Sequence, residues 1–241
     1  MKMQKIVLNP ERNVTLTAFI QDVDGEFGLE KRPAVLILPG GGYSFCSDRE
    51  AEVVAFAYLK AGYQAFILRY SVDEHKKWPN PLSDYEQAME LIKGNEDWHV
   101  YEDKIAVIGF SAGGHLAACA ATIAKNRPGA AILGYAVLSR VITNVYQDTA
   151  PIPVDEVTEQ TCPCFLFSAR DDGLVPVSDT LAFQMALFEK GVSFESHIYA
   201  YGPHGFSTGE KSLNSAEMSS RVINWVQDSI EWLADEFDVF K

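Results

Sequence analysis

The sequence has few basic residues for its size. Its 241 residues include 20 lysines and arginines against 33 aspartates and glutamates, which gives a formal net charge of −13. Binding to nucleic acid or to an anionic membrane surface depends on clustered lysine and arginine, and no such cluster stands out along the chain. We therefore expect neither nucleic acid nor a membrane as a partner, and an uncharged small molecule as the ligand.

Long apolar runs are also missing. Residues 1–12 contain no apolar stretch of signal-peptide length, and no later run approaches the ~20 apolar residues of a membrane-spanning helix. The four cysteines are scattered, and the pair Cys162 and Cys164 has neither zinc-ligand spacing nor a neighbouring Cys/His pair. These absences predict a cytoplasmic protein with free thiols, with no metal and with no other cofactor.

Repeats, low-complexity stretches and linker-like segments are absent as well. Hydrophobic residues make up 47% of the chain, which is enough for a large buried core. Chains of roughly 200–250 residues with α/β patterning commonly fold as one unit. The sequence thus predicts a single domain over residues 1–241, and it leaves open whether the protein forms a homo-oligomer.

What the chain does contain is a regular succession of short apolar runs and helical stretches. Two early runs, 5–8 and 14–21, are typical of antiparallel strands at one sheet edge. Six further runs are continuously apolar, as parallel strands covered on both faces are: 34–38, 64–68, 104–108, 131–138, 164–167 and 194–199. Five segments have helical length and spacing: 48–61, 84–93, 112–125, 178–190 and 215–234, with Gly62 and Gly191 as helix caps. This pattern predicts an α/β fold with one doubly wound, mostly parallel eight-stranded sheet and helices on both faces.

The strongest local motif is Gly109-Phe110-Ser111-Ala112-Gly113, which directly follows an apolar run and directly precedes an alanine-rich helical stretch. A G-x-S-x-G pattern also arises by chance, but chance does not supply the strand before it and the helix after it. This setting is that of a nucleophile elbow, a strained turn that lifts a serine hydroxyl above the sheet. The N-terminus of the helix favours negative charge on the reacting oxygen. We predict that Ser111 is a catalytic nucleophile.

Three consecutive glycines follow the apolar run 34–38. Glycines free the backbone to aim N–H groups at a ligand oxygen. A phosphate-binding loop is the alternative, and it is disfavoured because neither G-K-[ST] nor G-x-G-x-x-G follows. We therefore assign the amides of Gly41 and Gly42, together with that of Ala112, to an oxyanion hole.

A base for the serine has to come from the five histidines of the chain. In hydrolases with such an elbow the chain order is serine, acid, histidine, and this order leaves His197 and His204. His197 lies inside an alternating strand, whereas His204 lies in a loop with glycine and proline just after that strand. Loops at the carboxyl ends of strands carry the catalytic groups of open α/β sheets. We predict His204 as the general base, and His115 as a packed residue on the elbow helix.

Two adjacent aspartates, Asp171 and Asp172, follow the predicted strand 164–167 and precede a helix. A buried carboxylate at this position would orient the imidazole and stabilise the imidazolium that forms during catalysis. Adjacent side chains in a loop point apart, so only one aspartate can do this, and physical reasoning does not decide between them. The other is interpreted as a solvated or capping aspartate.

Five segments together carry a family resemblance: 40–43, Arg49-Glu50, 109–116, 172–176 and 203–206. They resemble the acetyl esterase and acetylxylan-esterase-like branch of the α/β-hydrolase superfamily, and the likeness covers nearly the whole chain. The resemblance implies an α/β-hydrolase fold, activity on acetyl and other short-chain esters, often of sugars, and Asp172 as the triad acid. One departure is a stretch between Leu138 and Cys162 that is shorter than in the relatives, which usually carry an extra helical stretch there.

The resulting hypothesis is a serine carboxylester hydrolase with a small-molecule ester as substrate and an acyl-enzyme intermediate. Tyr43 and Phe110 adjoin the oxyanion loop and the nucleophile, and we expect them to border a pocket with room for acetyl but not for long acyl chains. Two alternatives remain. A serine peptidase of the prolyl-oligopeptidase type is disfavoured because this chain shows no β-propeller gate. A non-catalytic hydrolase-fold binding module is disfavoured because all three triad residue types are present.

Overall fold

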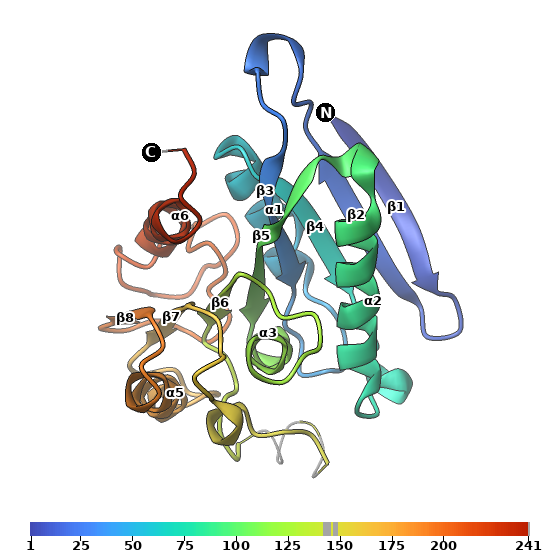
Figure 1. Ribbon diagram of the computed structural model, residues 1–241. Helices are drawn as coiled ribbons and strands as arrows, with labels where there is room; N and C mark the ends of the chain where they lie inside the picture. Colours follow the sequence, from blue (N-terminus) through green and yellow to red (C-terminus); the bar gives the residue numbers. More distant parts are fainter. Residues whose placement is uncertain (142–145, 147–148, 241) are drawn as a thin grey trace.

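The computed structural model describes residues 1–141, 146 and 149–240, and its centre is one eight-stranded sheet (Figure 1). The strand order is β1-β2-β4-β3-β5-β6-β7-β8. The pairs β1/β2 and β2/β4 are antiparallel and every other pair is parallel, which confirms the predicted sheet. The strands are β1 (Lys2–Asn9), β2 (Val14–Ile20), β3 (Arg32–Leu38), β4 (Gln64–Arg69), β5 (Val100–Phe110), β6 (Ala130–Gly134), β7 (Cys164–Ala169) and β8 (Phe194–Tyr199).

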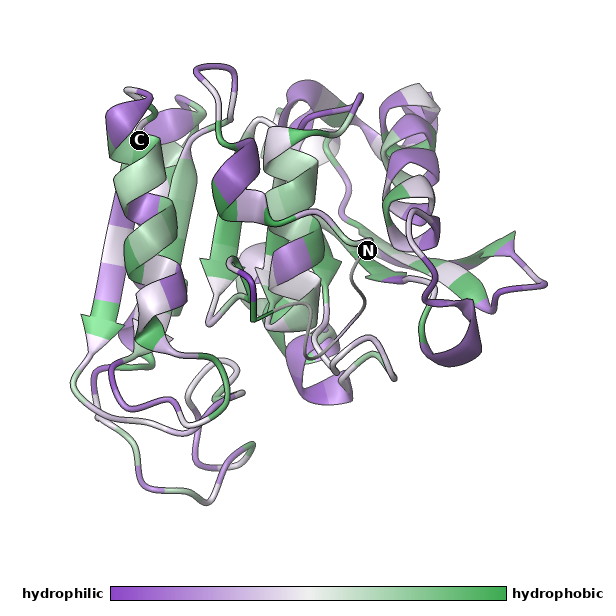
Figure 2. Ribbon diagram, turned by 90° about the horizontal axis from the view of Figure 1, so that it is seen from below, coloured by the Kyte–Doolittle hydropathy of each residue, from purple (hydrophilic) through white to green (hydrophobic). Residues whose placement is uncertain are grey.

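Helices cover both faces of the sheet, and Figure 1 shows α2 and α3 in front of it and α1 behind it. One core cluster holds side chains of α2, α3 and α5, and the other holds side chains of α1 and α6. In Figure 2 the central strands are mostly green, whereas the helices alternate between green and purple, as expected for helices with one buried side. The helices are α1 (Glu52–Lys60), α2 (Asn80–Gly94), α3 (Ala112–Thr122), α5 (Val177–Glu189) and α6 (Asn224–Glu236).

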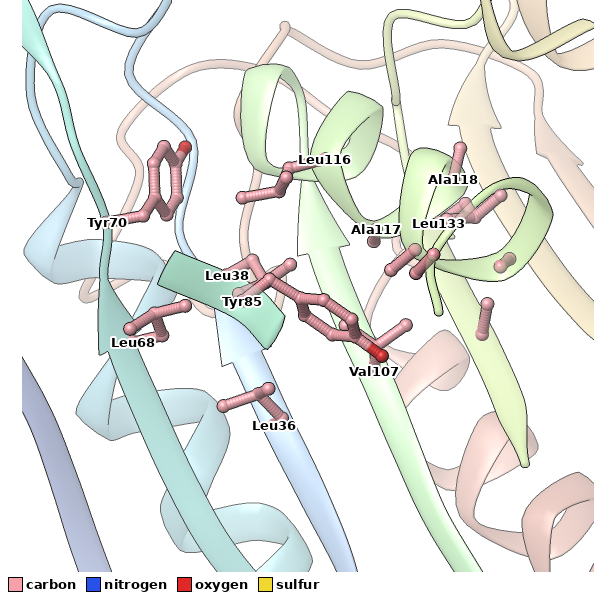
Figure 3. Packing of buried hydrophobic residues seen from close by; sticks show 14 of the residues in the cluster. Leu36, Leu38, Leu68, Tyr70, Tyr85, Val107, Leu116, Ala117, Ala118 and Leu133 are labelled. Atoms are coloured by element: carbon pink, nitrogen blue, oxygen red, sulfur yellow. The ribbon is translucent and has the colours of Figure 1, made fainter. Parts of the chain in front are cut away.

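Central strands such as β3, β6 and β7 are continuously apolar because both of their faces are buried. In β3, Leu36 and Leu38 join the cluster beneath α2 and α3, and Figure 3 shows them packed near Tyr85 of α2. The alternate residues Val35 and Ile37 join the opposite cluster. Successive side chains of a strand point to opposite faces, so a strand between two helical layers has no polar face. Full burial of such a side chain contributes about 1.5–3 kcal/mol to stability.

Several element boundaries differ from the predictions. The strand predicted over 131–138 ends at Gly134, because the next residue, Tyr135, takes a positive φ of 34° and the chain leaves the sheet. The last helix begins at Asn224 instead of residue 215. Residues before it form turns held by other partners, since the Ser219 N–H donates to Tyr201 O in the loop after β8. The periodicity of the sequence does not show that these backbone groups bond to a distant loop instead of forming a helix.

The glycine caps are confirmed. Gly62 and Gly191 directly follow the C-caps of α1 and α5, with φ values of 97° and 68°. A left-handed residue at this position ends a helix, and glycine adopts this conformation without steric cost.

The direction of the strands determines where the functional loops lie. The strands β3, β5, β6, β7 and β8 run parallel, so the loops after them meet at one edge of the sheet.

Candidate active site

The nucleophile elbow lies between β5 and α3. Ser111 has φ 52° and ψ −115°, a backbone conformation that is strained for a residue with a side chain. The turn is tight enough that a Cβ at Gly109 would lie 2.2 Å from Gly113 O, and one at Gly113 would lie 2.1 Å from Leu38 O. Both positions therefore require glycine, and the spacing of the motif follows from this close approach of α3 to the sheet.

The structure brings three of the predicted residues into one hydrogen-bonded chain. Ser111 Oγ lies 2.8 Å from His204 Nε2, and His204 Nδ1 lies 2.8 Å from Asp172 Oδ2. The residues come from the loops after β5, β8 and β7, which are far apart in sequence. This geometry matches a serine with an adjacent base that is itself oriented by a carboxylate.

The two aspartates have different environments. The Asp172 side chain is fully buried, and its Oδ1 accepts hydrogen bonds from the N–H groups of Leu174 and Val175 at 2.8 and 3.0 Å. Its other oxygen is thereby held toward His204. Asp171 is exposed and accepts the N–H of Gly202 at 2.9 Å, so it caps the loop that leads to His204. The geometry thus distinguishes Asp172, which bonds to His204, from Asp171, which does not. The residue types alone did not decide between them.

The predicted oxyanion donors lie at the same place. Gly41, Gly42 and Ala112 line a cavity that is also lined by Ser111 and His204. Gly41 and Gly42 have φ values of 135° and 61°, and a Cβ at Gly41 would lie 2.1 Å from Phe45 O, so the loop needs glycine. N–H groups at this wall can face an oxygen that gains charge near Ser111.

The cavity has a volume of about 260 Å³. Apolar side chains form much of its wall, and two of them, Phe45 and Leu174, are exposed at its mouth with 58% of their surface accessible. The full lining comprises Gly41, Gly42, Phe45, Ser47, Arg49, Glu50, Ser111, Ala112, Val137, Leu174, Val175, His204 and Gly205.

Tyr43 and Phe110 do not belong to this lining, which corrects the pocket predicted from the sequence. Phe110 is the last residue of β5 and points to the face opposite Ser111, where it packs on Phe167 and Trp225. Tyr43 has a φ of 57° and is fully buried in the other cluster. Neighbours in sequence face opposite sides of a strand, so adjacency to the nucleophile does not place a side chain in the pocket.

Tyr43 bonds instead to the histidine of the elbow helix. Its hydroxyl lies 2.7 Å from His115 Nδ1, and His115 Nε2 lies 2.9 Å from Pro151 O. Tyr146 stacks on Tyr43 with ring centroids 3.9 Å apart. His115 is fully buried, as predicted for a packed residue, and burial lowers its pKa to about 4. The oxyanion loop, the elbow helix and the chain near residue 150 are thus connected through one neutral imidazole.

This buried histidine should make folding sensitive to acid. An imidazole with a folded pKa of about 4 and an unfolded value of 6.5 binds its proton more readily in the unfolded chain. The contribution of neutral His115 to stability is fully present above about pH 6.5 and is lost as the pH falls toward 4. The loss reaches roughly 2 kcal/mol at about pH 4.5. Urea unfolding of wild type and His115→Gln between about pH 7 and 4.5 measures this. The free energy of unfolding should fall less in the variant than in wild type, because the variant lacks the proton that unfolding lets His115 bind. Equal pH slopes in the two proteins would contradict the expectation.

The other histidines stay away from the triad. His197 lies on β8, where it bonds to Glu195 at 2.7 Å and stacks on Phe165. His75 and His99 lie in or next to short 3-10 turns, and neither lines the active-site cavity. Within the described residues no group of three or more histidine, cysteine, aspartate or glutamate side chains lies close enough together to hold a metal. None of the helices found over the same residues combines the length and apolarity needed to cross a bilayer.

Two residues of the site were not assigned a role from the sequence. Glu50 lines the cavity although it is only 4% exposed, and Tyr135, fully buried, follows β6 and donates its hydroxyl to Glu50. Glu50 belongs to a segment that carries the family resemblance, but the sequence alone predicted no role for it. The signal that could have identified Tyr135 is its place at the carboxyl end of a central strand, where side chains commonly reach the site.

The fold and this site define a member of the α/β-hydrolase superfamily, and comparisons with known proteins agree. Residues 28–139 match the model of the family BD-FAE. The crystal structure of MGS-M1, an alpha/beta hydrolase enzyme from a Medee basin deep-sea metagenome library, is 44% identical, has a TM-score of 0.92 and covers 99% of both chains. An acetyl ester-xyloside bifunctional hydrolase from Caldicellulosiruptor lactoaceticus is 27% identical, with a TM-score of 0.83 over 97% of this chain and 91% of that chain.

Among curated proteins, the acetylxylan esterase of Xylanibacter ruminicola is 29% identical over 219 residues, which are 80% of this chain and 45% of the relative. The chain spans between about a third and a half of the length of the first curated relatives that it matches. The chain belongs to the α/β-hydrolase superfamily. The class of enzyme that these relatives support is a carboxylic ester hydrolase.

Proposed function

We propose that this chain is a serine esterase that hydrolyses short-chain acyl esters, mainly acetyl esters and including those of sugars. The observation that carries the proposal is the Asp172–His204–Ser111 chain, with both contacts at 2.8 Å, at the wall of a cavity of about 260 Å³. A serine hydroxyl is a weak nucleophile unless a base is within hydrogen-bond reach, and here one is. The cavity gives an ester access to it.

In the proposed mechanism His204 Nε2 removes the proton of Ser111 Oγ as that oxygen attacks the ester carbonyl. Asp172 stays ionised, keeps the Nδ1 proton of the imidazole on its own side and stabilises the imidazolium. The tetrahedral oxygen accepts hydrogen bonds from the amides of Gly41, Gly42 and Ala112. The imidazolium then protonates the departing alcohol, and water repeats the sequence on the acyl-enzyme.

The names of the relatives support the acetyl ester as the substrate class. One is an acetylxylan esterase and another a bifunctional hydrolase of acetyl esters and xylosides, and both align with most of this chain. The cavity itself fits an uncharged acyl group, because Val137, Leu174 and Val175 contribute to its wall. An apolar wall favours small alkyl groups and penalises an unpaired charge.

Labelling with a fluorophosphonate probe tests whether the serine is reactive at all. We expect wild type to be labelled at Ser111 and Ser111→Ala to remain unlabelled. A panel of esters and of prolyl peptides then separates the esterase from the peptidase. Absence of labelling in folded wild type would favour a non-catalytic binding module, and turnover of peptides but not esters would favour the peptidase.

The volume of the cavity limits the acyl chain. It must hold the acyl group together with part of the alcohol, so we expect the highest kcat/KM for acetyl to butyryl esters and a steep fall by octanoyl. Each methylene that fits an apolar wall adds only about 0.8 kcal/mol, whereas one that clashes is rejected. A p-nitrophenyl series from acetyl to decanoyl measures this, run beside acetylated xylose and glucose.

The alcohol should matter less than the acyl group. The mouth of the cavity is bordered by exposed side chains, Phe45 and Leu174, which leaves aryl and sugar alcohols room to extend outward. We therefore expect similar kcat/KM values for acetyl esters of different alcohols. Rates that kept rising to octanoyl and beyond would indicate a long acyl groove and contradict the proposed substrate class.

A further inference from the structure

We propose that Glu50 and Tyr135 act as a positioning pair that ties the oxyanion loop to the turn carrying His204. This inference rests on the proposed function, because it concerns how the same site is held. Both side chains are buried, and Glu50 belongs to the cavity wall. Neither residue touches Ser111 Oγ in the hydrogen-bonded chain, so their effect would act through the groups they hold.

Glu50 holds the oxyanion loop directly. Its Oε2 accepts the N–H of Gly40 at 2.8 Å, next to the two glycines that we assign to the oxyanion hole. The contact is so close that a Cβ at Gly40 would lie 2.8 Å from the same carboxylate oxygen. The Gly40 amide is thereby fixed by the protein, and we expect this bond to orient the amides of Gly41 and Gly42 that follow it. A carboxylate bonded to a backbone N–H is one of the stronger hydrogen bonds available.

Tyr135 extends this contact to the histidine turn. Its hydroxyl donates to Glu50 Oε1 at 2.6 Å and accepts the N–H of Ser207 at 3.1 Å. Its ring lies edge-on to the imidazole of His204, with centroids 5.1 Å apart. The Ser207 hydroxyl donates to the backbone carbonyl of Arg49 and closes the circuit. Glu50 and Tyr135 thus connect the loop after β3, the end of β6 and the loop after β8.

The hydrogen-bond pattern also assigns a charge to Glu50. Burial raises the pKa of this carboxyl, and the bonds from Tyr135 and Gly40 oppose that effect. Its two oxygens bond to the Gly40 N–H and to the Tyr135 hydroxyl, and both bonds favour the ionised form of the carboxyl.

Among the residues that the structure describes, the charged groups near His204 include two carboxylates and one cation. Asp172 lies against Nδ1, and Glu50 and Arg49 line the cavity beside Gly205. Tyr135 is the remaining titratable side chain packed on the ring, and burial keeps its hydroxyl protonated by raising its pKa. A negative charge at Glu50 stabilises the imidazolium that forms when His204 takes the serine proton.

Glu50→Gln removes the negative charge and keeps the size of the side chain. Tyr135→Phe keeps that charge and removes the hydroxyl that bonds to both Glu50 and Ser207. For Glu50→Gln we expect kcat to fall by about 10- to 100-fold with KM changed less, and the acidic limb of kcat/KM to move down by about one pH unit, because a negative charge near the imidazole is lost. For Tyr135→Phe, which keeps the carboxylate, kcat should fall by about tenfold without that downward movement of the limb. Hydrolysis of p-nitrophenyl acetate from about pH 5 to 9 measures both.

Tyr58→Phe is the matched control. Tyr58 is also fully buried and its hydroxyl bonds to Ser229 at 2.7 Å, but it lies outside the cavity lining. Its loss should lower thermal stability and leave kcat and the pH profile unchanged. The inference is overturned if folded Glu50→Gln keeps the wild-type kcat and acidic limb, or if folded Tyr135→Phe stays within about twofold of wild type. An inactive wild type would instead contradict the proposed function, so the two failures are distinguishable.

Discussion

Replacing Ser111 with alanine is expected to lower kcat by roughly 10⁴–10⁶ while the protein remains folded. The hydroxyl is the proposed nucleophile, and triad members act as a unit, so its loss leaves only the catalysis of the oxyanion hole and substrate binding. The change removes one oxygen and keeps the Cβ of the strained turn, so the elbow itself is unaltered. Initial rates with p-nitrophenyl acetate and circular dichroism of the same samples measure the two parts.

Ser168→Ala is a matched control for this experiment. Ser168 lies on β7 and is 2% exposed, and among the described residues its hydroxyl has no hydrogen-bond partner. Its removal should leave kcat at the wild-type value. A Ser111→Ala protein that retained a tenth of the wild-type activity would eliminate this serine as the nucleophile.

His204→Ala is expected to be as damaging as the serine replacement. His204 is the one described residue bonded to Ser111 Oγ that can take its proton, and without the imidazole Asp172 Oδ2 also loses its partner. In wild type, kcat/KM should have an acidic limb, because only an imidazole without the extra proton can act as a base. The variant should lose that limb together with its rate, which a pH series on both proteins measures.

Three further alanine variants define how specific this effect is. His197→Ala alters a partly exposed edge-strand residue bonded to Glu195, and it should retain wild-type activity. Asp171→Ala removes a cap on the loop before His204 and should have a small effect, whereas Asp172→Ala should lie between this and the loss of the base. If His197→Ala abolished turnover and His204→Ala did not, the assignment of the base would be wrong.

Much of the fold could be predicted because its pattern is local and repeated. A strand such as β3 is apolar at every position because both faces are buried, and that run is visible without knowing what covers it. Boundaries were less predictable where tertiary partners decide them. The end of β6 depends on the positive φ of Tyr135, and the start of α6 depends on turns held from the loop after β8.

The residues of the proposed triad were predictable because their positions are tied to strand ends and chain order. The pocket wall was not, since it depends on which way each side chain points. Tyr43 was expected at the wall and lies in the core, whereas Phe45, two residues further on, is at the mouth of the cavity. Glu50 shows the same limit, because only the fold reveals that an acidic residue after a glycine loop is buried and bonded.

The short stretch over 139–161 was expected to lie above the site, and residues 142–145 and 147–148 fall outside the described residues. The described part packs on the molecule: Val154 N–H donates to Leu138 O, and Asp179 accepts the N–H groups of Leu138 and Ser139. The start of the stretch is therefore held by hydrogen bonds to a buried carboxylate, which apolar periodicity in the sequence does not reveal.

The exposure of Phe45 and Leu174 bears on how this enzyme could change over evolutionary time. Both reach the mouth of the cavity, yet each leaves more than half of its surface in water, so few core contacts depend on its size. Substitutions at such positions usually alter stability by no more than about 0.5 kcal/mol. By comparison, the residues that hold Ser111, His204 and Asp172 are buried, and substitutions there cost more stability. Substrate range can therefore drift by single mutations at two sites without compensating changes elsewhere, which makes these positions the natural pair for a selection experiment toward new alcohols.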